Sequence, residues 1–169
     1  MKVPWKLRLA TVNDVPAILS LIKELALYEK EPERVLATKE LLEKTLFGTR
    51  AYAEVLLAVE KEQAVGMALF FHNYSTWLGK PGIYLEDLFV KESHRRTGIG
   101  KAMFGYLGKL ANERDCGRLD WSVLRWNSPS IAFYESLGAI SLGAEWDIFR
   151  LEGPALHALE DLLPNNSED

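Results

Sequence analysis

The chain has 169 residues, of which 48% are hydrophobic and 11% aromatic, and this composition predicts a folded globular protein rather than a disordered one. Its formal net charge of -4 argues against general binding to nucleic acids or anionic membranes. The single cysteine, Cys116, cannot form an internal disulfide, and no apolar run approaches the roughly 20 residues of a membrane span. The first residues also lack the apolar stretch of a signal peptide. We therefore expect a cytoplasmic protein with one domain over residues 1–169, frayed over 164–169.

The first part of the chain predicts two helices. Asn13 or Asp14 can cap the first helix, Pro16 suits its first turn, and apolar residues then recur at helical spacing. Thr38 is expected to open the second helix and Gly48 to close it.

The middle of the chain predicts strands. Residues 53–59 and 64–71 are expected to form an antiparallel hairpin with a short turn at 61–63. Residues 72–82 are expected to be a loop, and residues 83–90 a strand with two acids in its middle.

The last part predicts strands at 118–124 and 145–151, each followed by a helix. Ser128 is expected to cap the first of these helices, with Pro129 in its first position, and the second is a short amphipathic helix at 155–163. Strands and helices are mixed along one chain, so the predicted class is α/β or α+β, with a largely antiparallel start.

The stretch RRTGIGKAMF (95–104) places two glycines before an apolar helical pattern. The first turn of a helix presents free N–H groups and partial positive charge, and glycines let a ligand approach the backbone closely. Together these features make a pyrophosphate site, although a solvated basic turn explains the pattern equally well on its own. The basic residues around the turn are Lys91, His94, Arg95, Arg96 and Lys101.

Two other phosphate-binding motifs are excluded by the residues at one or two of their required positions. A dinucleotide-binding fingerprint needs a small residue where Met103 stands. A Walker A loop needs glycine at the position of Arg95 and serine or threonine at that of Ala102.

Three further segments carry a family resemblance: residues 8–30, YLEDLFV (84–90) and WNSPSIAFYESLGA (126–139). With the turn Arg95-x-x-Gly98-x-Gly100, they resemble the GNAT acetyltransferases, and within that family the diamine (spermidine/spermine) acetyltransferase branch. The resemblance implies a central mixed, mostly antiparallel twisted sheet flanked by helices. It also implies acetyl-CoA as co-substrate and commonly a homodimer formed through the sheet and C-terminal segments. The residues it implies for cofactor binding are Leu88, Phe89, Val90, Arg95, Arg96, Thr97, Gly98, Ile99, Gly100, Lys101, Asn127, Ser128, Pro129, Ser130 and Tyr134.

Acetyl transfer to an amine needs a proton acceptor, a hydrogen-bond donor for the carbonyl oxygen, and an acid for the departing thiolate. Glu86 is the expected proton acceptor, with Asp87 beside it on the opposite face of the strand. Phe89 or a neighbouring backbone N–H is the expected donor. Tyr134 is the expected acid, although packing against its own helix face is the alternative role.

Acidic residues on the acceptor side would attract a cationic amine. Glu31 and Glu33 are better explained as a solvated charge run, whereas Tyr28 and Glu29 match substrate-contacting positions of the diamine branch. The expected acceptor-binding residues are Tyr28, Glu29, Glu86, Asp87, Asp120, Trp121 and Ser122.

Two departures from the family pattern leave the acceptor open. Arg125 stands where relatives tend to carry an acid, and Arg96 replaces a small residue. A cation at 125 would disfavour long polyamines or welcome an acceptor with a carboxylate, so thialysine-like amino acids are the main alternative. A non-catalytic acetyl-CoA-binding module and a protein-lysine acetyltransferase are others. No metal is expected, since the histidines show no metal-ligand spacing. The net negative charge makes a nucleic-acid or membrane partner unexpected as well.

Overall fold

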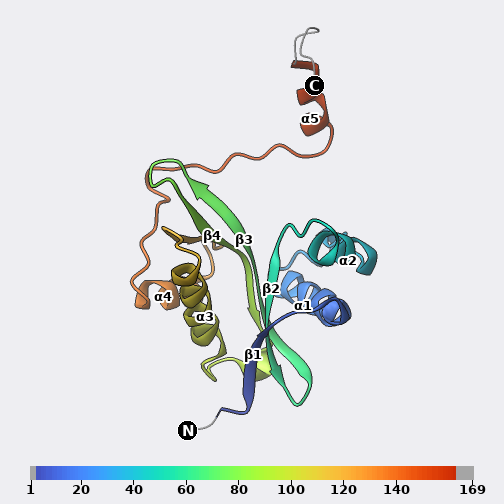
Figure 1. Ribbon diagram of the computed structural model, residues 1–169, viewed down its shortest axis with the longest axis vertical. Helices are drawn as coiled ribbons and strands as arrows, with labels where there is room; N and C mark the ends of the chain where they lie inside the picture. Colours follow the sequence, from blue (N-terminus) through green and yellow to red (C-terminus); the bar gives the residue numbers. More distant parts are fainter. Residues whose placement is uncertain (1–2, 163–169) are drawn as a thin grey trace. The chain divides into compact units, whose positions relative to one another are not determined.

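The computed structural model describes residues 3–162, except for the side chains of residues 160 and 161 (Figure 1). These residues belong to two compact units, Met1–Ser122 and Val123–Asp169, and each is described by itself. The first unit contains β1 (Trp5–Leu9), η1 (Val12–Asp14), α1 (Val15–Tyr28), η2 (Pro32–Arg34), α2 (Lys39–Phe47), β2 (Glu54–Glu60), β3 (Gln63–Ser75), β4 (Lys80–Val90), η3 (Glu92–His94), α3 (Ile99–Glu113) and β5 (Leu119–Trp121). The second contains α4 (Ser128–Ser136), α5 (Pro154–His157) and η4 (Ala158–Leu162).

The five strands of the first unit form one sheet in the order β1-β2-β3-β4-β5. Neighbouring strands are antiparallel, except that β4 and β5 are parallel. The expected mixed, mostly antiparallel sheet is therefore confirmed. The β4–β5 ladder ends where Leu85 pairs with Trp121, while β4 itself continues to Val90. Within the first unit, the end of β4 thus extends beyond its pairing with β5.

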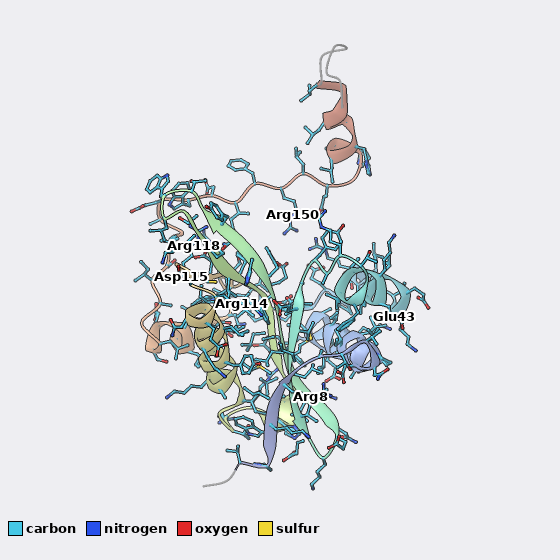
Figure 2. The ribbon with its side chains drawn as sticks, in the orientation of Figure 1. Arg8, Glu43, Arg114, Asp115, Arg118 and Arg150 are labelled. Carbon is cyan, nitrogen blue, oxygen red and sulfur yellow. The ribbon has the colours of Figure 1, made fainter. Side chains whose placement is uncertain are left out.

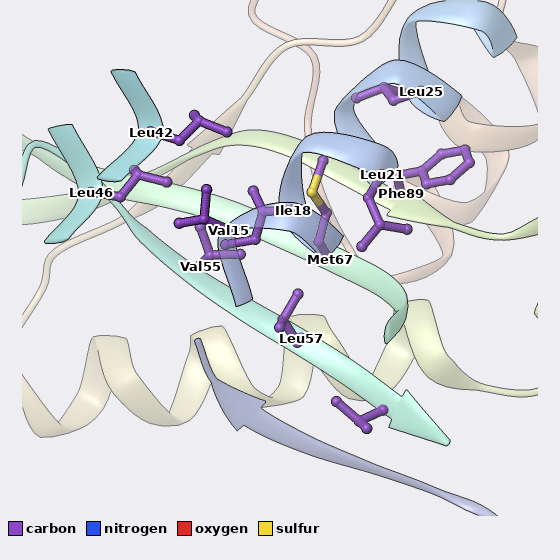
Figure 3. Close-up of a cluster of buried hydrophobic side chains, with 11 residues drawn as sticks. Val15, Ile18, Leu21, Leu25, Leu42, Leu46, Val55, Leu57, Met67 and Phe89 are labelled. Carbon is purple, nitrogen blue, oxygen red and sulfur yellow. The ribbon is translucent and has the colours of Figure 1, made fainter. Parts of the chain in front are cut away.

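Helices cover both faces of the sheet: α1 and α2 lie on one face and α3 on the other (Figure 1). The core on the first face joins apolar residues of α1 and α2 to those of β2, β3 and β4, among them Ile18, Leu57 and Phe89 (Figure 3). On the second face, α3 buries Ile99, Met103 and Leu107. Burial of these side chains supplies the main driving force for folding this unit.

The start of α1 follows from the residues that precede it. Asp14 accepts a 2.7 Å hydrogen bond from the Thr11 backbone N–H and forms two hydrogen bonds with the Arg8 guanidinium. These contacts, led by the Arg8 hydrogen bonds, lower the pKa of Asp14 to about 2. The predicted second helix also begins as expected, because the Thr38 side chain accepts a hydrogen bond from the Leu41 N–H.

The sheet differs from the expectation in three places. β1 was not predicted, and residues 72–82 are largely strand rather than loop, since β3 runs to Ser75 and β4 starts at Lys80. The polar residues of this segment sit in the β3–β4 ladder, where Asn73 pairs with Gly82. The expected strand at 118–124 is short, because its ladder with β4 ends at Trp121.

The second unit also differs from expectation. The cap of α4 is Asn127 rather than Ser128, because the Asn127 side chain accepts from the Ser130 N–H at 3.4 Å. The expected helix at 155–163 is split into α5 and η4 over the described residues, and residues 164–169 lie outside them. Residues 145–151 do not form the expected strand; Ile148 is 81% exposed and Phe149 92% exposed. A strand needs a neighbour for its backbone hydrogen bonds, and in the described part of the chain this segment pairs with none.

Candidate active site

A bulge in β4 determines where its acidic residues lie. Asp87 pairs with Leu69 of β3, whereas Leu85 pairs with the next residue, Phe70, so Glu86 is the extra residue on β4. Between these two pairs, β4 therefore contains one residue that has no partner on β3. The regular alternation from which we expected Glu86 and Asp87 on opposite faces is interrupted at this point.

The bulge brings Asp87 to the α1 face of the sheet. Its partner Leu69 packs against the core beneath α1 and α2, and directly paired residues share a face. In a regular strand Asp87 would instead share the face of Leu85, because side chains alternate with a period of two. The extra residue Glu86 reverses this phase, and Asp87 comes to lie on the side where α1 ends.

Asp87 is a partly buried carboxyl among other negative charges. Burial, together with the charges of Glu86 and Glu29, raises the pKa of Asp87 to about 6. Burial also raises the pKa of Glu29, which follows the last residue of α1. Glu86 itself is exposed. The structure thus brings together three of the acids that the sequence analysis assigned to acceptor binding.

The glycine turn lies between β4 and α3. Gly98 precedes the first residue of α3 with φ 89°, a left-handed conformation that favours glycine. The Ala102 N–H bonds to the Gly98 carbonyl, so the N–H groups of Ile99, Gly100 and Lys101 precede the first turn's hydrogen bond. A Cβ at Gly98 would lie 4.0 Å from the Trp5 ring, so this position leaves room above the turn. These donors and this space fit a pyrophosphate.

The two arginines of the turn differ in conformation and contacts. Arg96 has φ 63°, which is uncommon for a residue with a side chain, and its side chain is exposed. Arg95 donates through Nε to the Val90 carbonyl at 3.1 Å, and its guanidinium carbon lies 4.6 Å from the centre of the Tyr28 ring. Arg95 therefore contacts α1 as well as the turn.

Contacts from neighbouring elements hold the segment before the turn. Thr97 Oγ1 donates to the His94 carbonyl at 2.6 Å. His94 Nε2 lies 2.8 Å from Glu60 Oε2, which ties the segment to β2. The basic residues of this segment thus do not all face solvent, and those left exposed include Arg96 and Lys101.

The expected acceptor residues in β5 and directly after it make structural contacts. Asp120 Oδ2 lies 2.8 Å from Nε of Arg118, labelled in Figure 2, and accepts a 2.9 Å hydrogen bond from Asn73. Ser122 Oγ lies 2.7 Å from the Tyr84 hydroxyl, and Trp121 packs edge-on against a ring of α3. Asn73 was missed because residues 72–82 were expected to be a loop. The acceptor role of the β5 residues stays a prediction.

The remaining predicted residues belong to the second unit. Asn127 is 8% exposed and caps α4, which places Ser128, Pro129 and Ser130 in the first turn of that helix. Tyr134 lies further along α4, and its ring centre is 5.5 Å from that of Phe133. Their predicted cofactor and catalytic roles stay predictions, as do those of the residues in the first unit.

Among the side chains that the structure describes, no cluster of three or more His, Cys, Asp or Glu residues could hold a metal ion. Over the same residues, no helix is both long and apolar enough to cross a membrane.

The chain is similar to known acetyltransferases. The family model described as "Acetyltransferase (GNAT) family" matches residues 17–139. A thialysine N-epsilon-acetyltransferase from Bos taurus is 37% identical, with 90% of this chain and 95% of the relative covered. A spermidine/spermine N(1)-acetyltransferase-like protein from Homo sapiens is 34% identical, with 86% of this chain but 22% of the relative covered.

A solved structure has the same fold. An integron cassette protein from the mobile metagenome of V. cholerae superposes with a TM-score of 0.79 at 26% identity, covering 94% of this chain and 99% of its own. The family match spans most of the chain and includes β4, the glycine turn and α4. The chain therefore belongs to the GNAT family of N-acetyltransferases, and it is similar to the spermidine/spermine acetyltransferase branch.

Proposed function

We propose that this enzyme transfers the acetyl group of acetyl-CoA to a primary amine of a small cationic acceptor of the diamine or polyamine type, by direct attack in a ternary complex. The observation that carries the proposal is the bulge at Glu86. It places Asp87 on the face where Glu29 lies, and β4 then leads through η3 into the glycine turn. An anionic acceptor side and a phosphate-binding turn are thus connected by the end of one strand and a short 3-10 helix.

The residues of the glycine turn suit the pyrophosphate of coenzyme A. The N–H groups of Ile99, Gly100 and Lys101 would donate to it, and the exposed side chains of Arg96 and Lys101 would neutralise its charge. The backbone of Leu88–Val90, beyond the β4–β5 ladder, would hold the pantetheine chain. Coenzyme A, when bound, presents the acetyl group as a thioester that a neutral amine can attack.

The reaction requires two proton movements. The amine nitrogen forms a bond to the acetyl carbon, the C–S bond breaks, and the thiol leaves. The amine gives up one proton, and the sulfur gains one. We assign acceptance of the amine proton to Glu86 and Asp87. With its pKa raised to about 6, Asp87 is a stronger base than an ordinary aspartate and titrates near neutral pH.

We assign protonation of the sulfur to Tyr134 of α4, because a phenol hydroxyl can donate to a thiolate of similar basicity. We also assign Asn127 and the first turn of α4 to cofactor binding.

Three negative groups support a cationic acceptor. Glu29 and Glu86 lie close enough to Asp87 for their negative charges to raise its pKa. A protonated amine bound among the three carboxylates would relieve the repulsion between them. A diamine or polyamine retains one positive charge after the other amine loses its proton. Such an acceptor can therefore be held by one carboxylate while another takes up the proton.

A second acceptor class is an amino acid with a side-chain amine. The relative that is 37% identical is named for thialysine, and the exposed Arg125 offers a cation for a carboxylate. We also propose the homodimer and the cytoplasmic location expected from the sequence.

The test is release of free thiol from acetyl-CoA in the presence of diamines, spermidine, lysine, thialysine and aminoalkyl acids. We expect turnover with at least one primary amine, fastest with diamines or polyamines. Fastest turnover with thialysine would replace the acceptor by the second class. Binding of acetyl-CoA without turnover on any amine would overturn the catalytic proposal in favour of a binding module.

A further inference from the structure

Two contacts join α1 to the segment after β4, and their partners are four residues apart in both segments. Lys91 Nζ lies 3.2 Å from Glu24 Oε1, and the Arg95 guanidinium carbon lies 4.6 Å from the centre of the Tyr28 ring. Glu24 and Tyr28 are four residues apart on α1, so they lie on the same face of the helix. The last turn of α1 is therefore attached to the segment that leads into the glycine turn.

Arg95 is held in place from three directions. Its Nε donates to the Val90 carbonyl, and its guanidinium lies over the Tyr28 ring and 5.9 Å from the centre of the Phe89 ring. Phe89 is 6% exposed and belongs to the core beneath α1. A guanidinium over aromatic faces gains electrostatic attraction without losing its charge. Arg95 thus connects a buried residue of the core, the end of α1 and the start of the glycine turn.

The end of α1 also forms part of the proposed acceptor side. Glu29 directly follows Tyr28, and its charge reaches Asp87. Any shift of Tyr28 therefore moves the backbone that carries Glu29. On the other side, Arg95 precedes Arg96 and Gly98, whose left-handed conformations shape the turn.

We propose that Arg95 is a positioning residue that couples the glycine turn to the acceptor side through the Tyr28 ring. This inference rests on the proposed function. A bound pyrophosphate orders the glycine turn and thereby fixes the position of Arg95. Arg95 in turn holds the Tyr28 ring, and with it the backbone of Glu29. Because coupling between two sites is reciprocal, loss of the Tyr28 ring weakens cofactor binding although Tyr28 belongs to the acceptor side.

A double-mutant cycle on coenzyme A binding tests this coupling. The variants are Arg95→Ala, Tyr28→Leu and the double variant, each titrated with coenzyme A by calorimetry. Loss of the cation–π contact in Tyr28→Leu should raise the Kd about two- to fivefold. The double variant should bind no more weakly than Arg95→Ala alone, because the two residues act through the same contact. Effects that multiply, or a Tyr28→Leu variant that binds like the wild type, would overturn the coupling.

Two controls separate coupling from loss of structure. Tyr28→Phe keeps the aromatic face and should bind coenzyme A within about twofold of the wild type. Glu24→Gln removes the neighbouring ion pair without touching Arg95, and it should also stay within about twofold. If Glu24→Gln weakens binding as much as Tyr28→Leu, the effect is a general loosening of α1 and the inference fails.

The acceptor provides a second readout. With spermidine and with thialysine as probes, Tyr28→Leu should raise the acceptor KM several-fold, whereas Glu24→Gln should leave it unchanged. A purely structural role would lower the melting temperature of Tyr28→Leu without changing the Kd or KM. Wild-type protein that gives no heat with coenzyme A would overturn the proposed function itself, which is a different outcome from an additive cycle.

Discussion

Glu29, at the end of α1, lies close enough to Asp87 on β4 for its negative charge to raise the pKa of the Asp87 carboxyl. The two residues are far apart in sequence, and the bulge at Glu86 allows them to share one face of the sheet. Burial is the larger cause of the shift, and Glu86 contributes as well. Ionisation of Asp87 in this concentration of negative charge therefore decreases the stability of the folded state.

The first prediction concerns Asp87→Asn and pH. The pKa of Asp87 is raised from 3.8 to about 6, so the folded state binds this proton more tightly and wild-type stability falls as pH rises from about 4 to 6. Above that window the ionised carboxylate costs up to about 3 kcal/mol, which asparagine avoids. Thermal unfolding should therefore show Asp87→Asn as the more stable protein at about pH 8, with the difference vanishing toward pH 4.

The same substitution should lower the turnover rate, since asparagine neither accepts the amine proton nor attracts a cation. Glu29→Gln is the matched control, because it removes one of the charges that raise the pKa of Asp87. The pH range over which stability falls should therefore move downward in this variant but remain present. A stability difference between wild type and Asp87→Asn that does not change with pH would contradict the account.

The sequence predicted the elements whose signals are local. Asp14, Pro16 and Thr38 mark helix starts that the structure confirms, and the glycine turn precedes α3 as expected. The bulge at Glu86 could not be predicted, because it depends on the register of β3 against β4 and not on either sequence alone. The expected strand at 145–151 was wrong for a similar reason, since the sequence of one segment does not supply the neighbouring strand.

A second prediction separates two effects of Arg96. Its φ of 63° costs a residue with a side chain roughly 1 kcal/mol, and glycine would relieve this strain at some loss of unfolded-state entropy. We expect Arg96→Gly to be as stable as the wild type or up to about 1 kcal/mol more stable, and to bind acetyl-CoA roughly tenfold more weakly. Unfolding and calorimetric titration measure the two effects.

Arg96→Lys is the control, because it keeps the charge and the strained backbone. It should resemble the wild type in stability and bind acetyl-CoA more tightly than Arg96→Gly. Equal affinities of wild type and Arg96→Gly would show that this side chain does not contact the cofactor.

A third prediction tests the acid on α4. Tyr134→Phe keeps the ring but removes the hydroxyl, so it should lower kcat by about 10²- to 10⁴-fold and change acetyl-CoA affinity by less than about twofold. Steady-state kinetics and calorimetry on the same preparation measure both quantities. An unchanged kcat would leave Tyr134 with a packing role, consistent with its contact to Phe133.

A fourth prediction concerns acceptor selectivity. Arg125→Glu should raise kcat/KM for spermidine relative to thialysine by about tenfold, because it replaces attraction for a carboxylate by attraction for a second amine. Arg125→Gln, which removes the charge without reversing it, should give an intermediate ratio. A ratio that stays at the wild-type value in both variants would show that Arg125 does not face the acceptor.

The central claim is transfer of one acetyl group to a primary amine, and product analysis tests it most directly. Purified protein is incubated with acetyl-CoA and spermidine or thialysine, and the thiol released is compared with the acetylated amine detected by mass spectrometry. We predict one acetylated amine for each thiol released, and almost none with Asp87→Asn. Thiol release without an acetylated amine, or saturable acetyl-CoA binding with neither product, would contradict the account.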